Sequence, residues 1–208
     1  MPILPGHQLR VIDVETTGLF PEGHRILEVA SVRLDDGRVG EAWSSFVRPD
    51  RRIPPEAVAV HGITAEMVRD APDTRAVATA LAAEIGDRPL VFHHARFDVP
   101  FLRALMREGG QPPLTQPVID TLGLARGLDP RGGHSLGRLA QRYGVQRMER
   151  HRALPDATTT AMLLVVLAER WERDRGIRSL MELAAVSQDV LRRMPDLPAE
   201  TEAEAAEP

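Results

Sequence analysis

The sequence predicts an α/β fold, and two features of its pattern lead to that prediction. Strand-like segments lead the chain, and short strands then alternate with amphipathic helices, an order typical of a sheet flanked by helices. The 208 residues are 43% hydrophobic, which is enough to bury one substantial core. We therefore expect one main domain.

Three strands are expected first, over residues 8–15, 26–34 and 38–47, the last two joined like a hairpin at Asp35-Asp36-Gly37. Apolar periodicity and turn residues place the later elements. These are mostly helical structure over 54–87 broken at Pro72, a strand at 89–93, a helix at 96–108, a short strand near 118–120, and helices at 135–143, 155–173 and 179–193.

The first strand carries two carboxylates. Asp13 and Glu15 alternate with apolar residues, and a strand projects every second side chain to the same face, so the two lie on one side about 7 Å apart. Ile12 and Val14 make the other face apolar, as in a buried central strand. Buried carboxylates repel each other unless protons or a divalent cation neutralise them. The pair alone is also compatible with a strand end that runs into a solvated loop.

A third carboxylate, Asp98, lies at the start of the helix expected at 96–108. Phe101, Leu102 and Leu105 follow it at helical spacing, so Asp98 shares the apolar, core-facing stripe. Its burial argues for a cation or a dedicated donor. An aspartate that only complements the helix dipole would occupy the same place.

The last acidic segment, His151-Arg-Ala-Leu-Pro-Asp156, enters a long helix. Pro155 suits a first helical turn, which places Asp156 near the N-terminus and His151 on the loop before it. A histidine there is either a surface or capping residue, or a base beside a metal-binding aspartate.

Together, Asp13-x-Glu15, Asp98 and His151-x4-Asp156 have the order and spacing of the DEDDh 3′→5′ exonucleases. The chain resembles this DnaQ-like family, which includes the proofreading epsilon subunit of bacterial DNA polymerase III, ribonuclease T and oligoribonuclease. The resemblance implies a ribonuclease H-like fold with a mixed five-stranded sheet flanked by helices. It runs from about Leu9 to about Glu169 and includes Thr16-Thr-Gly-Leu19, His61-Gly-Ile-Thr64, Asp120-Thr121 and His134-Ser-Leu-Gly-Arg-Leu-Ala140. His94 departs from it, because many relatives carry Asn there, and this puts a local hydrogen bond in doubt.

The resemblance also implies the roles of these residues. Asp13, Glu15 and Asp156 would hold two Mg²⁺ or Mn²⁺ ions per site, and Asp98 would hold one directly or through water. Oxygen-only ligands without Cys suit these cations better than a closed zinc site. Such ions stabilise the charge that builds on the attacking and leaving oxygens of a phosphodiester. His151 would remove a proton from the attacking water, because a histidine with its reference pKa of about 6.5 is mostly neutral at pH 7.

Substrate contacts are implied for six residues. Thr16 would offer backbone contacts to the 3′-OH, and His93 would lie near the phosphate. Plain core packing is the alternative for the apolar members of the set. The residues that would pack on the terminal sugar or base are Leu19, His61, Ile63 and Phe97.

Composition narrows the function further. The chain has no Cys, and all 26 basic residues are Arg, which excludes a thiol nucleophile, a Walker-type phosphate loop and a Schiff-base lysine. The net charge is −4, but residues 196–208 contribute −5, so residues 1–195 carry +1. Without the four proposed metal ligands the remainder is +5, and arginines such as Arg96 or Arg138 suit contact with phosphate.

These patterns lead to a set of expectations. Residues 1–175 would form an exonuclease domain, 176–195 an additional C-terminal helix, and 196–208 an acidic, disordered tail. The partners would be single-stranded 3′ ends, either of DNA in proofreading or repair, or of RNA in trimming, and a DNA polymerase is a further candidate partner. A non-catalytic adaptor with the same fold is the rival hypothesis. No apolar run is long enough to span a membrane, so a cytoplasmic location is expected, and the oligomeric state stays open.

Overall fold

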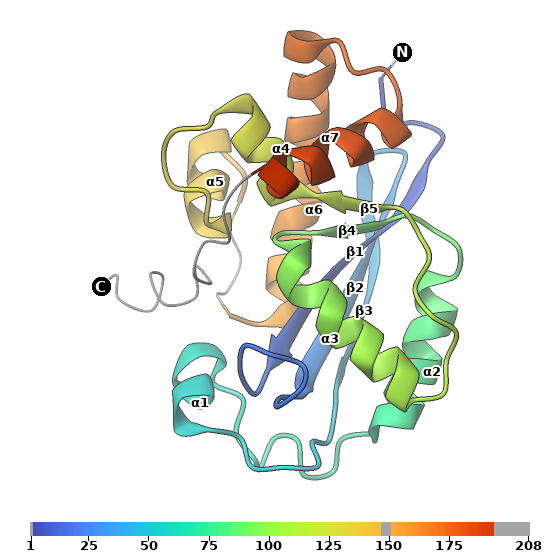
Figure 1. The fold of residues 1–208 in the computed structure, drawn as a ribbon, viewed down its shortest axis with the longest axis vertical. Helices are drawn as coiled ribbons and strands as arrows, with labels where there is room; N and C mark the ends of the chain where they lie inside the picture. The colour runs from blue at the N-terminus through green and yellow to red at the C-terminus, as the bar shows by residue number, and fades with distance from the viewer. Residues whose placement is uncertain (1, 147–150, 194–208) are drawn as a thin grey trace.

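The computed structural model describes residues 2–146 and 151–193. Five strands form one mixed sheet in the order β3-β2-β1-β4-β5 (Figure 1). Strand β1 is antiparallel to β2, β2 is antiparallel to β3, and β4 and β5 run parallel to β1. The strands are β1 (Gln8–Thr16), β2 (Ile26–Asp35), β3 (Arg38–Phe46), β4 (Leu90–Phe92) and β5 (Val118–Asp120). The predicted mixed five-stranded α/β fold is confirmed.

Helices cover both faces of this sheet (Figure 1). On one face, Leu9 and Val11 of β1 belong to the same hydrophobic cluster as Leu164 of α6. On the other face, Ile12 and Val14 pack with residues of α2 and α3. The helices of the described residues are α1 (Pro55–His61), α2 (Thr74–Ile85), α3 (Ala95–Glu108), α4 (Thr121–Leu128), α5 (Leu136–Tyr143), α6 (Ala153–Arg175) and α7 (Leu180–Arg193). None of them is long and apolar enough to cross a membrane.

The alternation predicted for β1 is confirmed by this packing. Asp13 and Glu15 follow Leu9 and Val11 on the face that α6 covers, and they reach the carboxyl end of the strand. Strand β4 ends beside them because it is parallel to β1. The site therefore lies where the carboxyl ends of two adjacent strands meet.

The helical structure predicted over 54–87 is present and is interrupted before Pro72, and one further helix lies where none was predicted. Residues 54–87 contain the separate helices α1 and α2, and Gly62, with φ 70°, ends α1 well before Pro72. Helix α4 was not expected, because its sequence contains two glycines, which lower helix propensity.

Tertiary packing accounts for both glycines of α4. A Cβ atom at Gly123 would lie 2.1 Å from the Ser187 carbonyl oxygen of α7, and one at Gly127 would lie 2.5 Å from the Trp171 ring of α6. The glycines therefore allow close packing between helices. The helix expected at 179–193 is observed as α7, whereas the tail predicted over 196–208 lies outside the described residues.

Candidate active site

The five residues predicted to be catalytic line a single cavity of about 790 Å³. They come from three segments of the chain, which meet at the carboxyl ends of β1 and β4. Strand β1 supplies two, helix α3 supplies one, and the last two come from the start of α6 and the residue before its N-cap. The residues are Asp13, Glu15, Asp98, His151 and Asp156.

Three of the carboxylates form a group that could hold a metal ion. Asp13, Glu15 and Asp156 each offer an oxygen, and these oxygens lie within 4.8 Å of one another. An all-oxygen set of this kind fits a hard divalent cation such as Mg²⁺ or Mn²⁺. Asp98 lines the same cavity but is not a member of this group.

The carboxylates disfavour one another's ionisation. Burial raises the pKa of Asp13 well above its ordinary value, and the charges of Asp98, Asp156 and Glu15 raise it further. Burial, followed by the charges of Asp156 and Glu28, raises the pKa of Glu15 to about 8. The group is therefore under strain unless protons or a cation neutralise it.

The charge of the cavity wall leads to the same conclusion. Besides the four predicted metal ligands, the wall includes the acidic Glu56. Among the residues that the structure describes, no arginine lines this cavity. The ionised carboxylates would repel a phosphodiester here, and added positive charge would offset that repulsion.

Asp98 is placed by the first turn of α3, and its side chain is 3% exposed. Burial raises its pKa well above the ordinary value, and the charge of Asp120 raises it further, while the backbone amides of Asp98 itself and Val14 lower it. The core-facing position predicted from helical spacing is confirmed. The amide contacts provide the dedicated donors that its burial requires.

The start of α3 depends on Asp120 rather than on the side chain of its own N-cap. His94 is the N-cap residue, with φ 78°, and its side chain makes no capping hydrogen bond. Instead, the buried carboxylate of Asp120 accepts from the His94 amide at 3.1 Å and the Ala95 amide at 2.7 Å. It also accepts from the Leu122 amide at 2.9 Å, at the start of α4. Asp120 thus couples two helix starts, and the departure at His94 leaves α3 capped.

His151 lies just before α6 and adopts a left-handed backbone conformation with φ 54°. Its backbone N–H donates to Oδ2 of Asp156 at 3.2 Å. The loop predicted to carry a base is thus tied directly to a predicted metal ligand.

Thr16 and His61 lie together under the predicted substrate site. His61 Nδ1 accepts from the Ile63 amide at 2.9 Å, so Nε2 carries the proton and donates to the Thr16 carbonyl at 3.2 Å. The Thr16 hydroxyl donates to the Gly18 carbonyl at 2.7 Å. His61 is 6% exposed, so it positions the backbone of Thr16 and offers little surface of its own.

The other predicted substrate residues have different surroundings. Leu19 and Phe97 line the cavity, and Leu19 is 39% exposed. Ile63 has no exposed surface and packs with Leu27 and Val68, so the structure places it in the core, and the alternative of plain packing holds for it.

His93 lines the cavity, but both of its ring nitrogens are engaged within the protein. Nε2 donates to the His134 carbonyl at 3.1 Å, and Nδ1 pairs with the Thr121 hydroxyl at 2.8 Å. Burial, then the neighbouring His94, lowers the pKa of His93 to about 3, so the ring is neutral. Contact with a phosphate would require one of these bonds to break.

Phe20 is a lining residue that the sequence reasoning missed. Its side chain is 67% exposed at the cavity, and an exposed aromatic ring suits stacking against a base. The sequence does indicate this role. An aromatic residue in a turn shortly after the Asp-x-Glu motif belongs to no strand or helix through which it would pack into the core.

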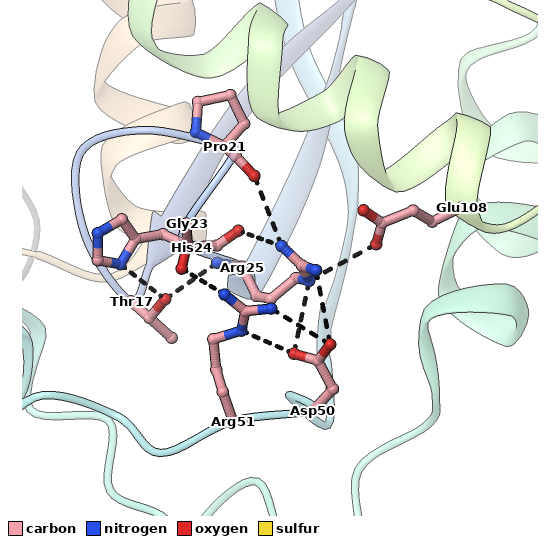
Figure 2. Close-up of polar contacts among 8 residues, drawn as sticks. All are labelled: Thr17, Pro21, Gly23, His24, Arg25, Asp50, Arg51 and Glu108. Carbon is pink, nitrogen blue, oxygen red and sulfur yellow. Dashed lines mark hydrogen bonds and ion pairs between the residues drawn. The ribbon is translucent and has the colours of Figure 1, made fainter.

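A polar network holds the loop of Phe20 (Figure 2). The Arg25 amide donates to the Thr17 hydroxyl at 2.9 Å, and the Arg25 guanidinium lies 3.5 Å from Asp50 and 3.6 Å from Glu108 of α3. Arg51 donates to the Gly23 carbonyl and pairs with Asp50 at 2.8 Å (Figure 2). The loop over 17–25 is therefore fastened at several points. Arg96, a candidate for phosphate contact, instead donates to the Leu191 carbonyl at 2.6 Å.

Comparison with known proteins places this site in a family. The RNase_T family model, described as Exonuclease, matches residues 11–164. The DNA polymerase III PolC-type of Staphylococcus epidermidis (strain ATCC 35984) is 33% identical over 174 residues, which is 83% of this chain and 12% of that protein. The PolC-type polymerase of Staphylococcus aureus (strain bovine RF122) is 35% identical over 186 residues, or 88% of this chain and 13% of that protein. The chain thus spans only a small part of the length of these relatives.

Solved structures show the same relationship. Exonuclease X in complex with 5′ overhanging duplex DNA has a TM-score of 0.69 at 34% identity, covering 86% of this chain and 99% of that one. Escherichia coli Exonuclease I with a dT13 oligonucleotide has a TM-score of 0.73 at 22% identity, covering 82% and 43%, which shows a shared fold. Because the family model covers most of the chain and a solved exonuclease shares a third of its residues, the chain belongs to the DnaQ-like exonucleases that its acidic motifs predicted.

Proposed function

We propose that the chain is a metal-dependent 3′→5′ exonuclease that releases 5′-mononucleotides from single-stranded DNA ends. The observation that supports this most is one cavity lined by Asp13, Glu15, Asp98, Asp156 and His151, with no arginine among its described lining residues. Bound cations would offset the repulsion between these ionised carboxylates and a polyanionic strand. It also contains a base candidate, His151.

The carboxylates divide into two kinds. Asp13, Glu15 and Asp156 would hold Mg²⁺ or Mn²⁺, because their oxygens already converge. Asp98 would hold a cation through water, because it lines the cavity outside that group. The bound ions would stabilise negative charge on the attacking and leaving oxygens of the phosphodiester.

The remaining residues bind the strand and move the proton. His151 would accept the proton of the attacking water, from a backbone that its bond to Asp156 holds beside the carboxylates. Thr16 would offer its backbone to the 3′-OH, and Leu19, Phe97 and Phe20 would contact the sugar and bases. The cavity volume of about 790 Å³ lies within the usual range of small-ligand sites, as a terminal nucleotide requires.

DNA is the proposed substrate because of what the relatives are. Exonuclease X was solved with duplex DNA that has a 5′ overhang, and the curated relatives are DNA polymerases. These relatives support a role in proofreading or repair, and they make a DNA polymerase the first partner to test.

The test is digestion of a 5′-labelled single strand with and without Mg²⁺. We expect a ladder of shortened products and free 5′-mononucleotides, both abolished by EDTA and by Asp13→Ala. Matched DNA and RNA strands, paired or mismatched at the 3′ terminus, then define the substrate. Preference for RNA would replace the DNA proposal with RNA trimming. A strand that stays intact after long incubation with Mn²⁺ would refute the exonuclease proposal in favour of a non-catalytic adaptor.

A further inference from the structure

Arg152, the residue that follows His151, is held by the carboxylate of Glu28, which lies 124 residues earlier in the chain. Arg152 Nε and Nη2 each donate to Glu28 of β2, at 2.9 Å and 2.9 Å. This is a two-bond fork, the strongest geometry available to an arginine and a carboxylate. Arg152 also lies 5.3 Å from the ring centre of Phe46 on β3. The backbone of the helix that carries Asp156 is thereby tied to the sheet.

Glu28 makes a second contact with the same segment. Its Oε2 accepts from the backbone amide of Ala153, the first residue of α6, at 3.1 Å. The side chain of Arg152, the N-cap residue of α6, makes no capping hydrogen bond, so Glu28 supplies a cap from another element. The Glu28 side chain is 6% exposed, which protects these charge-assisted bonds from water.

The backbone of His151 needs such support. A left-handed conformation is unfavourable for a non-glycine residue and persists only where its surroundings hold it. On one side, the His151 amide is bonded to Asp156. On the other side, Arg152 and Ala153 are bonded to Glu28. Four hydrogen bonds therefore fix three consecutive residues at the edge of the cavity.

The place of Glu28 in the sheet connects this support to the metal ligands. Glu28 is the direct partner of Glu15 in the pairing of β1 with β2, so their side chains project from the same face of the sheet. Glu28 thus fixes the position of the segment carrying His151 relative to the strand that carries Asp13 and Glu15.

We infer that Glu28 and Arg152 are positioning residues, whose two-bond fork holds His151 at the place from which it serves the reaction. Neither side chain is among the described residues that line the cavity, so neither touches the substrate. This inference rests on the proposed function for its kinetic consequence, whereas its structural consequence can be observed without any turnover.

The decisive variant is Arg152→Lys, which keeps the positive charge but cannot form two parallel bonds. We expect kcat on a single-stranded DNA to fall about 10- to 100-fold, because small misplacement of a catalytic group is costly. The KM for the strand and the calorimetric affinity for Mn²⁺ should stay near their original values. Glu28→Gln should lower kcat to a similar extent, and the double variant should lose no more kcat than the worse single variant. Full kcat in Arg152→Lys would overturn the inference, since charge alone would then suffice.

A matched control separates positioning from stability. Arg10 is a buried arginine on β1 that donates to the Glu84 carbonyl at 2.9 Å, and its side chain lies on the face opposite Asp13 and Glu15 and does not line the cavity. Arg10→Lys should lower the melting temperature but leave kcat unchanged. A loss of kcat in Arg10→Lys equal to that in Arg152→Lys would show that lost stability alone explains the effect, and would overturn the inference.

A spectroscopic measurement tests the same inference without activity. The chain has seven histidines, and the His151 ring signal can be assigned from its disappearance in His151→Gln. In Arg152→Lys we expect that one signal to shift or broaden while the other six persist. An unchanged His151 signal would overturn the inference. If the wild-type protein forms no product ladder, the proposed function fails, but the ring signal still decides whether Arg152 positions His151.

Discussion

Neutralising Glu15 should change how the stability of the metal-free protein depends on pH. Burial, with the charges of Asp156 and Glu28, raises the pKa of the Glu15 carboxyl from 4.5 to about 8. A carboxyl with a raised pKa holds its proton more tightly in the folded chain than in the unfolded chain. Unfolding therefore releases a proton between these pKa values, and the free energy of unfolding falls as pH rises through this range.

The range from pH 7 to pH 9 separates the buried carboxyls from the histidines. The lowered pKa values of His93 and His61 affect stability only below the ordinary histidine pKa of about 6.5, where they act in the opposite direction. The chain has no Cys and one Tyr, and its basic side chains are all Arg, so few other side chains titrate in this range. The raised pKa of Asp13 acts in the same direction as that of Glu15.

The expected size follows from the pKa. Averaged from pH 7 to pH 9, folded Glu15 binds about half a proton more than the unfolded residue, which corresponds to a loss of about 1.4 kcal/mol of unfolding free energy. For a chain of this length, that is a fall of about 3–6 °C in melting temperature. Glu15→Gln should reduce this loss by the share that Glu15 contributes, because the variant carries no charge at either pH, while the raised pKa values of Asp13 and Asp98 remain.

The assay is urea denaturation and thermal melting at both pH values, in EDTA and again in excess Mg²⁺. Excess Mg²⁺ should stabilise the wild type and flatten its pH dependence, because the bound carboxylates are ionised. Glu41→Gln is the matched control, since the Glu41 side chain on β3 is 82% exposed, and it should keep the wild-type slope. A metal-free wild type that is equally stable at pH 9 and pH 7, or a Glu15→Gln variant with the wild-type slope, would refute the reasoning.

Three further predictions concern single residues. His151→Gln should lower kcat about 10²- to 10⁴-fold while the calorimetric affinity for Mn²⁺ is kept, and a variant with normal kcat would remove His151 as the base. Phe20→Ala should raise KM for a single-stranded DNA about tenfold through lost stacking, and Phe20→Trp should restore it; equal KM values in all three proteins would contradict a stacking role. Asp120→Asn should lower the free energy of unfolding by about 1–3 kcal/mol, because an amide nitrogen cannot accept the backbone N–H bonds that the carboxylate accepts at the starts of α3 and α4. A melting curve identical to that of the wild type would show that these bonds are dispensable.

Local patterns in the sequence were sufficient for much of the site. The period of two in a strand placed Asp13 and Glu15 on one face, and helical spacing placed Asp98 among core residues, both as observed. Pro155 correctly indicated that Asp156 lies in the first turn of a helix. These predictions succeeded because they depend only on neighbours a few residues away.

Contacts between distant segments lay beyond such reasoning. Helix α4 forms despite two glycines, because α6 and α7 pack closely against it and Asp120 caps it. Ile63 belongs to the motif His61-Gly-Ile-Thr64, yet packing removes it from the cavity. Nothing in the residues next to Arg152 indicates that Glu28 would hold it.

The order of the acidic residues and His151 therefore determined the family and the identity of the candidate catalytic groups, and the order of strand-like and helical segments determined the α/β class. The tertiary structure alone decided which oxygens converge, which rings face the cavity and what holds His151 in place. The physical reason is that periodicity describes the direction of a side chain within its own element. Convergence depends on how the sheet, α3 and α6 pack against one another.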